Sequence, residues 1–219
     1  MGESFRIWLE SANSGDKRYV FTDLDETLIH GLEVGWLKDC PGNDNYAAVL
    51  VHGRHPHPDV VDIAWEGKKV HIFPRPYLKD WLVECNKFAT VCLLTHSKQD
   101  RALKCLKALK LTKYFHAIYS TRDLEPNELG EKYNLTNKKW VLIDNMKRDT
   151  VEMINKLRIL GMSSNEKDPK KEGQHILKNS ADHFVNIKGW YPTVDDSEDY
   201  HLMRVLPEIK KKLGLPVSS

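Results

Sequence analysis

Two acidic runs each follow a short apolar segment, and they carry the residue types that phosphoryl transfer needs. Asp23 and Asp25 lie two residues apart, directly after Arg18–Thr22. The pair Asp144-Asn145 directly follows the apolar run WVLI. In an extended chain, residues two apart point to the same side, so both aspartates can face one substrate. One carboxylate can attack phosphorus to give an acyl phosphate, while a second carboxylic acid protonates the departing oxygen and later activates water.

An anionic nucleophile that approaches an anionic phosphate also needs a cation. Mg²⁺ is held in proteins by one or two carboxylates together with the substrate phosphate and several waters. Asp23 and the Asp144-Asn145 pair could supply the protein's share. The alternative is that Asp23, Asp25 and Thr27 only open a turn or cap a helix. Because a second apolar run ends in Asp-Asn later in the chain, the pattern favours a magnesium-dependent phosphatase.

Apolar runs of strand and helix type alternate along the chain, which predicts a parallel sheet with helices on its faces. The predicted strands are Arg18–Thr22, Thr90–Thr95, Ala117–Tyr119, Trp140–Ile143 and His183–Ile187. The predicted helices are Pro76–Cys85, one that follows Ser97, Thr150–Leu160 and Tyr200–Leu213. In such a sheet, ligands bind beyond the carboxyl ends of the strands. The acidic residues fall at these ends.

One domain is expected over residues 17–215, after an N-terminal extension at 1–16. Residues 31–72 predict a flap with a β-hairpin around a Glu-Gly turn, and residues 161–180 form a polar insertion, of which 163–173 is predicted to be a mobile loop. The flap is long enough for a hairpin but too short for a helical lid. An open site suits a macromolecular substrate, such as a phosphorylated protein segment.

The run FTDLDETLIH resembles the first motif of haloacid dehalogenase-like phosphatases. It is most similar to the FCP/SCP group, also called NLI-interacting-factor-like and named for phosphatases of the RNA polymerase II C-terminal domain. Later runs match in order: FPRPYLKDWL, VCLLTHS, WVLIDN and HFVNIKGWYPTVDDSEDYHLMRVLPEI. The resemblance spans residues 17–213. It implies an α/β, Rossmann-like fold whose central parallel sheet is flanked by helices, with a small β-hairpin flap instead of a full cap domain.

The resemblance implies a role for each residue that matches a family motif. Asp23 matches the nucleophile, and Asp25 matches the general acid and base, whose backbone carbonyl is also a metal ligand in the family. Thr27 matches the residue that braces this loop. Thr95 matches the hydroxyl that binds the phosphate.

The Asp-Asn motif matches the family's magnesium site. Asp144 and Asn145 complete a set of expected metal-site residues with Asp23 and Asp25, and Asn145 is the more direct ligand of the pair. The expected cofactor is therefore Mg²⁺.

The family also uses a lysine ahead of the Asp-Asn motif, to neutralise the phosphoryl oxygens and the aspartate. The usual interval falls near Glu128, where this chain has no lysine, and the nearest candidates are Lys132, Lys138 and Lys139. Because the last two directly precede a strand, we expect Lys132 to be the catalytic lysine. Arg122 is the alternative cation.

Four residues are weaker candidates for substrate contacts. Arg75 begins the helix after the flap, and a structural role is the alternative for it. His96 and Ser97 flank the expected phosphate-binding Thr95, and capping of the next helix is the alternative for Ser97. Arg122 follows the Ala117–Tyr119 run.

Composition argues against several partners. The chain has 219 residues, and Lys plus Arg number 33 against 31 Asp plus Glu, so its net charge of +2 gives no reason to expect nucleic acid or a membrane. No apolar run approaches the ~20 residues of a membrane span. The four cysteines show no CxxC spacing, which favours reduced thiols in a cytoplasmic protein. The family resemblance also allows a nuclear location.

The sequence thus predicts a phosphoric monoester hydrolase that acts on phosphoserine or phosphothreonine in a protein or peptide, as a monomer by default. A phosphatase of nucleotides, nucleic-acid ends or another small phosphoester is the alternative enzyme. A protein that keeps the fold for binding and has lost catalysis is the third hypothesis.

Overall fold

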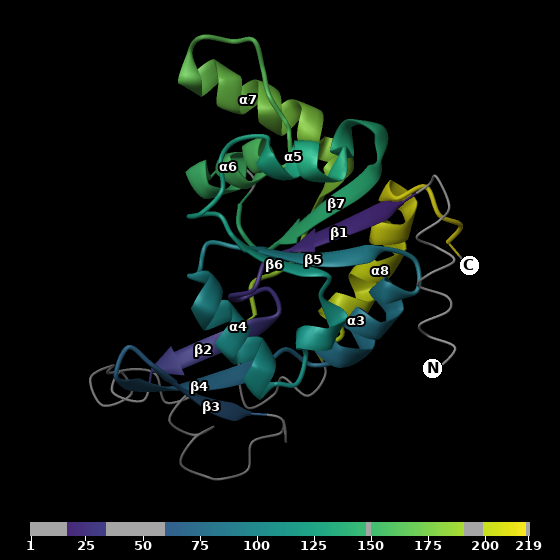
Figure 1. The fold of residues 1–219 in the computed structure, drawn as a ribbon. Helices are drawn as coiled ribbons and strands as arrows, with labels where there is room; N and C mark the ends of the chain where they lie inside the picture. Colours follow the sequence, from purple (N-terminus) through teal and green to yellow (C-terminus); the bar gives the residue numbers. More distant parts are fainter. Residues whose placement is uncertain (1–16, 34–59, 148–149, 191–198, 218–219) are drawn as a thin grey trace.

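The computed structural model describes residues 17–33, 60–147, 150–190 and 199–217. Five parallel strands form the larger sheet (Figure 1): β1 (Arg18–Thr22), β5 (Thr90–Thr95), β6 (Ala117–Ser120), β7 (Lys139–Asp144) and β8 (Phe184–Asn186). Their order across the sheet is β6-β5-β1-β7-β8. The predicted α/β fold with a central parallel sheet is confirmed, and each predicted strand is present to within two residues at either end.

Helices cover both faces of this sheet (Figure 1). They are α3 (Leu78–Asn86), α4 (Gln99–Ala108), α5 (Glu128–Tyr133), α6 (Val151–Ile159), α7 (Pro169–Asn179) and α8 (His201–Lys212). Along β1, Val20 packs with α3, α4 and α8, whereas Phe21 packs with α5, α6 and α7. Both residues are fully buried. The strands are therefore apolar on both faces because each face carries its own core.

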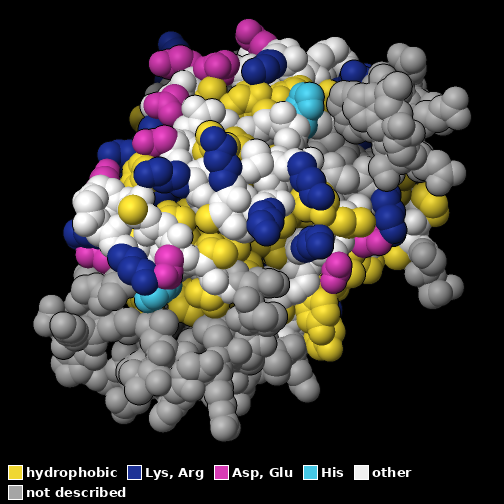
Figure 2. Space-filling view, turned by 60° about the horizontal axis from the view of Figure 1, so that its bottom comes forward, with side chains coloured by type: hydrophobic (Ala, Val, Ile, Leu, Met, Phe, Trp, Pro, Cys, Tyr) yellow, Lys and Arg dark blue, Asp and Glu magenta, His cyan; other side chains and the backbone are white. Residues whose placement is uncertain are grey.

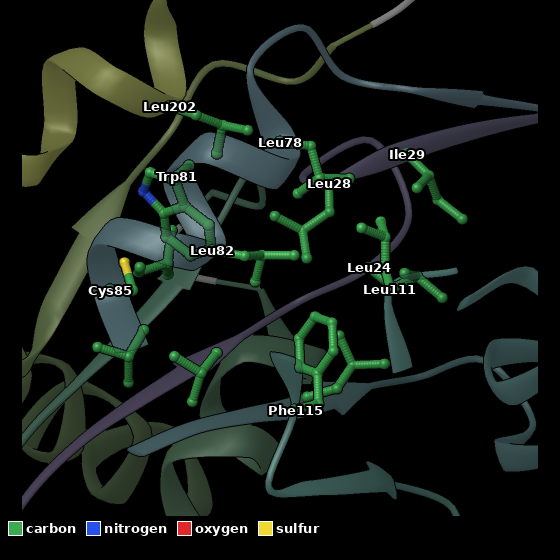
Figure 3. Packing of buried hydrophobic residues seen from close by; sticks show 14 of the residues in the cluster. Leu24, Leu28, Ile29, Leu78, Trp81, Leu82, Cys85, Leu111, Phe115 and Leu202 are labelled. Atoms are coloured by element: carbon green, nitrogen blue, oxygen red, sulfur yellow. The ribbon is translucent and has the colours of Figure 1, made fainter. Parts of the chain in front are cut away.

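The core on the α3, α4 and α8 side is the larger of the two (Figure 3). Trp81 and Leu82 of α3 are fully buried in it, beside Leu24 and Leu28 of the loop that follows β1. Each such side chain contributes about 1.5–3 kcal/mol on burial. Apolar packing against α3 thus fixes the loop that carries the acidic motif.

The prediction of a mobile loop over residues 163–173 is wrong in its second half. Asp168 accepts from two backbone N–H groups in the first turn of α7, and Pro169 occupies that turn, so a capped helix begins here. Only Gly173 and Ile176 of this helix are buried. A helix with so narrow an apolar face gives little periodic signal in the sequence.

The smaller sheet contains β2 (Ile29–Glu33), β3 (Val61–Trp65) and β4 (Lys68–Pro74), in the antiparallel order β2-β4-β3. The predicted hairpin around Glu66-Gly67 is confirmed, and both turn residues have positive φ, as a two-residue hairpin loop favours. The structure adds β2 as a third strand. Residues 34–59 of the predicted flap and the N-terminal extension lie outside the described residues.

Figure 2 shows Lys and Arg side chains spread over the visible face rather than gathered in one patch.

Cys85, Cys92 and Cys105 are free and buried, and Cys40 lies outside the described residues. In the part of the chain that the structure describes, no helix combines the length and the apolar character that crossing a bilayer requires.

Candidate active site

The carboxyl ends of β1, β5 and β7 meet at one edge of the parallel sheet. Asp23 directly follows β1, and its backbone N–H donates to the carbonyl of Ile143 in β7 at 2.9 Å. Thr95 is the last residue of β5, and Asp144 is the last residue of β7. Parallel pairing of β1 with both neighbours therefore brings three predicted side chains together at the edge where α/β sheets bind ligands.

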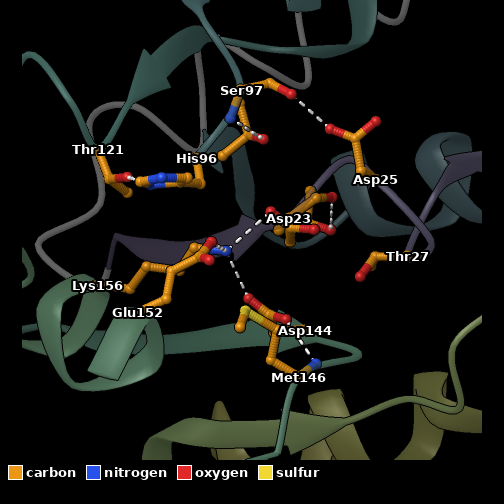
Figure 4. Close-up of polar contacts among 12 residues, drawn as sticks. Asp23, Asp25, Thr27, His96, Ser97, Thr121, Asp144, Met146, Glu152 and Lys156 are labelled. Carbon is orange, nitrogen blue, oxygen red and sulfur yellow. Dashed lines mark hydrogen bonds and ion pairs between the residues drawn. The ribbon is translucent and has the colours of Figure 1, made fainter. Parts of the chain in front are cut away.

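A lysine that the sequence pattern did not predict completes this edge (Figure 4). Lys156 lies in α6, and its Nζ donates to Asp23 Oδ1 at 2.8 Å and to Asp144 Oδ2 at 2.7 Å. The Lys156 side chain has no exposed surface. Glu152, one turn earlier in the helix, lies 3.5 Å from the same Nζ. Lys156 thus joins the acidic residues at the ends of two neighbouring strands.

The predicted position of Lys132 at the site is wrong. Lys132 is exposed on α5, where its Nζ lies 5.0 Å from the centre of the Tyr119 ring. The catalytic lysine was expected before Asp144 in the sequence. Lys156 instead follows Asp144, in α6, and its side chain lies at the ends of the strands. One signal could have found it, because Lys156 lies one turn after Met153 on the buried face of α6.

Two buried carboxylates share one ammonium group at this edge. Burial raises the pKa of Asp23 to about 7, Lys156 opposes the rise, and the Asp144 charge adds to it. Burial lowers the pKa of Lys156, but the two carboxylates raise it by more, so the lysine stays protonated. With both aspartates ionised, the cluster holds one more negative than positive charge. This excess favours a further cation at the pocket.

Thr27 ties the loop after β1 to the end of β7. Its Oγ1 donates to Asn145 Oδ1 at 2.8 Å and accepts from the Asn145 backbone N–H at 3.1 Å. Arg75 is 2% exposed and donates to the Thr27 carbonyl at 3.1 Å and to Asp199 Oδ2 at 2.9 Å. Thr27 is thus placed to brace the loop. Arg75 lies behind the loop and is not among the described residues that line the pocket, which favours its structural alternative over a contact with substrate.

A pocket of about 280 Å³ opens over this edge. The residues that line it are Asp23, Asp25, Glu26, Thr95, His96, Ser97, Arg122, Asn145, Met146 and Glu152. The structure thus brings together most of the side chains that the sequence singled out. Thr27 and Asp144 contact lining residues from behind, whereas Arg75 and Lys132 lie elsewhere.

The polar side chains after β5 and β6 form one wall of the pocket. Thr95 Oγ1 accepts from the Ser97 backbone N–H at 3.1 Å, so its own proton can be donated to a phosphate oxygen. Arg122 Nε donates to the His96 carbonyl at 2.8 Å, which holds the guanidinium at the rim. Ser97 does not cap α4. Its hydroxyl instead donates to Asp25 Oδ2 at 2.6 Å (Figure 4).

Oxygen atoms suited to a hard cation line the same pocket. Asp23, Asp25 and Asn145 all border it, and Lys156 binds only one carboxylate oxygen of Asp23. A set of carboxylate and amide oxygens such as these, completed by waters, fits Mg²⁺. Asp144 differs, because its Oδ1 accepts from a backbone N–H, its Oδ2 accepts from Lys156, and it has no exposed surface. Both oxygens of Asp144 thus have partners within the protein, and its side chain holds the lysine; its role as a metal ligand stays a prediction.

Residues 19–159, more than half of the chain, match the family described as NLI interacting factor-like phosphatases. The chain belongs to this family. The matched region includes Asp23, Thr95, Asp144 and Lys156. The predicted membership in a haloacid dehalogenase-like family of phosphoric monoester hydrolases is confirmed.

Two solved structures resemble this NLI interacting factor-like chain. One is Fcp1, described as an essential RNA polymerase II CTD phosphatase, with a TM-score of 0.54, 18% identity, and coverage of 96% of this chain and 64% of that chain. The other is fission yeast Fcp1-R271A bound to beryllium fluoride, with a TM-score of 0.51, 18% identity, and coverage of 96% and 65%. At this identity they show a shared fold. The chain spans less than two thirds of either protein, and no curated protein matches it.

Proposed function

We propose that this protein is a magnesium-dependent phosphatase that hydrolyses phosphomonoesters through an aspartyl-phosphate. The observation that carries the proposal is the buried pair of Asp23 and Lys156 at the pocket. Lys156 fixes one carboxylate oxygen of Asp23, which leaves the other to attack phosphorus. The Thr95 hydroxyl is a fixed donor for charge that develops on the phosphoryl oxygens, and Lys156 supplies fixed positive charge behind Asp23; fixed groups of this kind need no reorganisation during reaction.

The two aspartates of the motif divide the chemistry. In the first step, Asp23 forms a bond to phosphorus, the bond from phosphorus to the ester oxygen breaks, and Asp25 gives its proton to that oxygen. In the second step, water attacks phosphorus and passes a proton to Asp25, and the bond from phosphorus to Asp23 breaks. Inorganic phosphate leaves, and both side chains return to their starting states.

Asp23, the backbone carbonyl of Asp25 and the side chain of Asn145 would hold the magnesium ion. The bound ion supplies positive charge that offsets the repulsion between a carboxylate and a phosphate. Thr27 orients Asn145 through the paired hydrogen bonds between the two residues.

A chelator should abolish the phosphatase activity, and added Mg²⁺ should restore it. Asn145→Ala should raise the magnesium concentration for half-maximal activity about 10-fold or more, because it removes one oxygen ligand. Asn145→Asp is the matched control, since it keeps an oxygen at that position. Titrations of activity and calorimetric Mg²⁺ binding check both variants. Full activity in excess chelator would contradict the metal dependence.

We further propose that the substrate is phosphoserine or phosphothreonine in a protein. The described residues that line the pocket include no Phe, Tyr or Trp, so a nucleobase could stack there only on His96 or Arg122. Its volume of about 280 Å³ accommodates a phosphoryl group and the side chain that carries it. The solved relative Fcp1 is described as a phosphatase of the RNA polymerase II CTD, which is a protein substrate.

A short phosphopeptide should have a kcat/KM at least tenfold higher than that of a nucleoside monophosphate or free phosphoserine. Contacts along the peptide hold the phosphate in line with Asp23, and tenfold corresponds to about 1.4 kcal/mol of transition-state discrimination. A panel of phosphopeptides, nucleotides and sugar phosphates with Mg²⁺ checks this. Nucleotides that outcompete every phosphopeptide tenfold would establish the alternative enzyme. No turnover of any substrate would favour a binding protein that lacks catalysis.

We also propose that the protein works in a reducing compartment, the cytoplasm or the nucleus. The support is that Cys85, Cys92 and Cys105 are free, buried thiols, and that burial raises the pKa of each.

A further inference from the structure

The side chain of Asp25 is held by Arg101 of α4 and by Ser97 of the loop that precedes α4, and Figure 4 shows the contact with Ser97. Arg101 Nη1 lies 2.9 Å from both carboxylate oxygens of Asp25. The same Nη1 donates to Ser97 Oγ at 2.6 Å, and Ser97 Oγ donates to Asp25 Oδ2 at 2.6 Å. Asp25, Ser97 and Arg101 thus form a closed triangle of contacts at the rim of the pocket.

Arg101 acts from behind the pocket wall. Asp25 and Ser97 line the pocket, whereas Arg101 is not among its lining residues, and the Arg101 side chain is only 19% exposed. The Arg101 guanidinium therefore affects the pocket only through its contacts with residues that line it, Asp25 above all. A residue placed in this way can orient a reacting group without touching the substrate.

A glycine in the smaller sheet makes room for this guanidinium. Gly31 lies in the middle of β2, where glycine is unfavourable unless another group approaches closely. A Cβ at this position would lie 2.9 Å from Arg101 Nη2. The remaining neighbours, Ile72 and Val70, are 3.5 and 3.7 Å away, so the guanidinium is the group that limits the space.

We propose that Arg101 is a positioning residue that orients Asp25 for both proton transfers, and that Gly31 provides the space it needs. The inference rests on the proposed phosphatase function and assigns a residue that touches neither substrate nor metal. The departing ester oxygen and the later attacking water both exchange a proton with Asp25. Contacts from Arg101 and Ser97 fix the Asp25 side chain, the acid in the first transfer and the carboxylate in the second, in the geometry that each transfer requires.

The test is the dependence of kcat/KM on the leaving group. Arg101→Met keeps the apolar stem and removes the contacts to Asp25. In a series of substituted phenyl phosphates of similar size, the variant should lose about tenfold or more for phenyl phosphate. It should lose much less for dinitrophenyl phosphate, whose leaving group departs as a stable anion and needs no proton. In Arg101→Met, kcat/KM should therefore fall more steeply than in the wild type as the leaving group becomes more basic. This slope is the expected signature of the positioning role.

Three further variants distinguish positioning from a merely structural role. Arg101→Lys keeps a cation, so its leaving-group slope should lie between those of Arg101→Met and the wild type. Gly31→Ala places a methyl group against the Arg101 guanidinium and displaces it. This variant should also have a steeper slope than the wild type, but less steep than that of Arg101→Met. Lys104→Met is the matched control, because Lys104 also links α4 to the smaller sheet, by donating to the Ala64 carbonyl at 3.0 Å. It should keep the wild-type slope.

The outcomes separate this inference from the function on which it rests. If the wild type hydrolyses no aryl phosphate, or if Asp23→Asn is equally active, the proposed function fails. If the wild type is active and Arg101→Met loses activity equally for all leaving groups, or loses none, the positioning role is overturned. Thermal unfolding of each variant identifies any loss of fold, and Gly31→Ala then provides the independent test.

Discussion

Asp23→Asn should abolish turnover of every substrate while leaving the fold intact. The amide cannot form the acyl phosphate, and loss of a nucleophile that works in concert with its neighbours costs about 10⁴-fold or more. Lys156 and Asp144 remain paired in this variant, so the buried cluster becomes neutral. Steady-state rates with an aryl phosphate and a phosphopeptide check the loss, and near-wild-type rates would remove the aspartyl-phosphate mechanism.

The same substitution should change how stability depends on pH in the metal-free protein. The pKa of Asp23 is raised in the folded state, from an ordinary 3.8 to about 7, so ionisation of Asp23 opposes folding. Wild-type stability should therefore fall as the pH rises between these two values, because the unfolded chain releases its proton first. Asp23→Asn should lack this decline and should be at least as stable as the wild type at neutral pH. Thermal unfolding in a chelator, measured across the range, checks both parts.

Lys156→Met should reduce both activity and stability. The change leaves the buried carboxylates of Asp23 and Asp144 without their shared cation, and removal of one partner from a buried ion pair costs about 3–5 kcal/mol. Loss of the fixed positive charge that holds Asp23 should lower kcat about 100-fold or more. Urea unfolding and steady-state kinetics measure the two effects.

Two comparisons separate catalysis from charge balance. Adding Asp144→Asn to Lys156→Met removes one charge of each sign, so part of the stability should return while the activity stays low. Lys132→Met is the matched control from α5, and because its exposed side chain lies over the Tyr119 ring it should leave kcat unchanged. A loss of activity in Lys132→Met with full activity in Lys156→Met would reverse the assignment of the lysine.

The fold was predictable because the strands of a parallel sheet covered on both faces are unusual in sequence. The run WVLI is apolar at every position, and it ends just before Asp144 and the pocket-lining Asn145. Polar residues at such an end, Asp23 or Thr95 for example, are therefore conspicuous. Because the carboxyl ends of neighbouring parallel strands meet, these residues are expected at one edge of the sheet.

The partners of these residues were less predictable, because side-chain contacts depend on how helices cross the sheet. Lys156 is separated from Asp23 by 133 positions in sequence, and nothing local couples them. Ser97 had a local role available as a helix cap, and the structure uses its hydroxyl on Asp25 instead. α7 was missed because Gly173 sits in mid-helix, where a Cβ would lie 3.0 Å from Ile154, so tight packing overrides propensity.

The position of Lys156 after the Asp-Asn motif divides the active site into two contiguous stretches of chain. The first ends with Arg122 and holds both motif aspartates and the wall after β5. The second begins at β7 and holds Asp144, Asn145 and the lysine. Between them, residues 123–127 are largely exposed and line no part of the pocket. This loop is thus the natural place to cut the chain for a split-enzyme reporter, whose two fragments regain a complete site only when a fused pair of proteins brings them together.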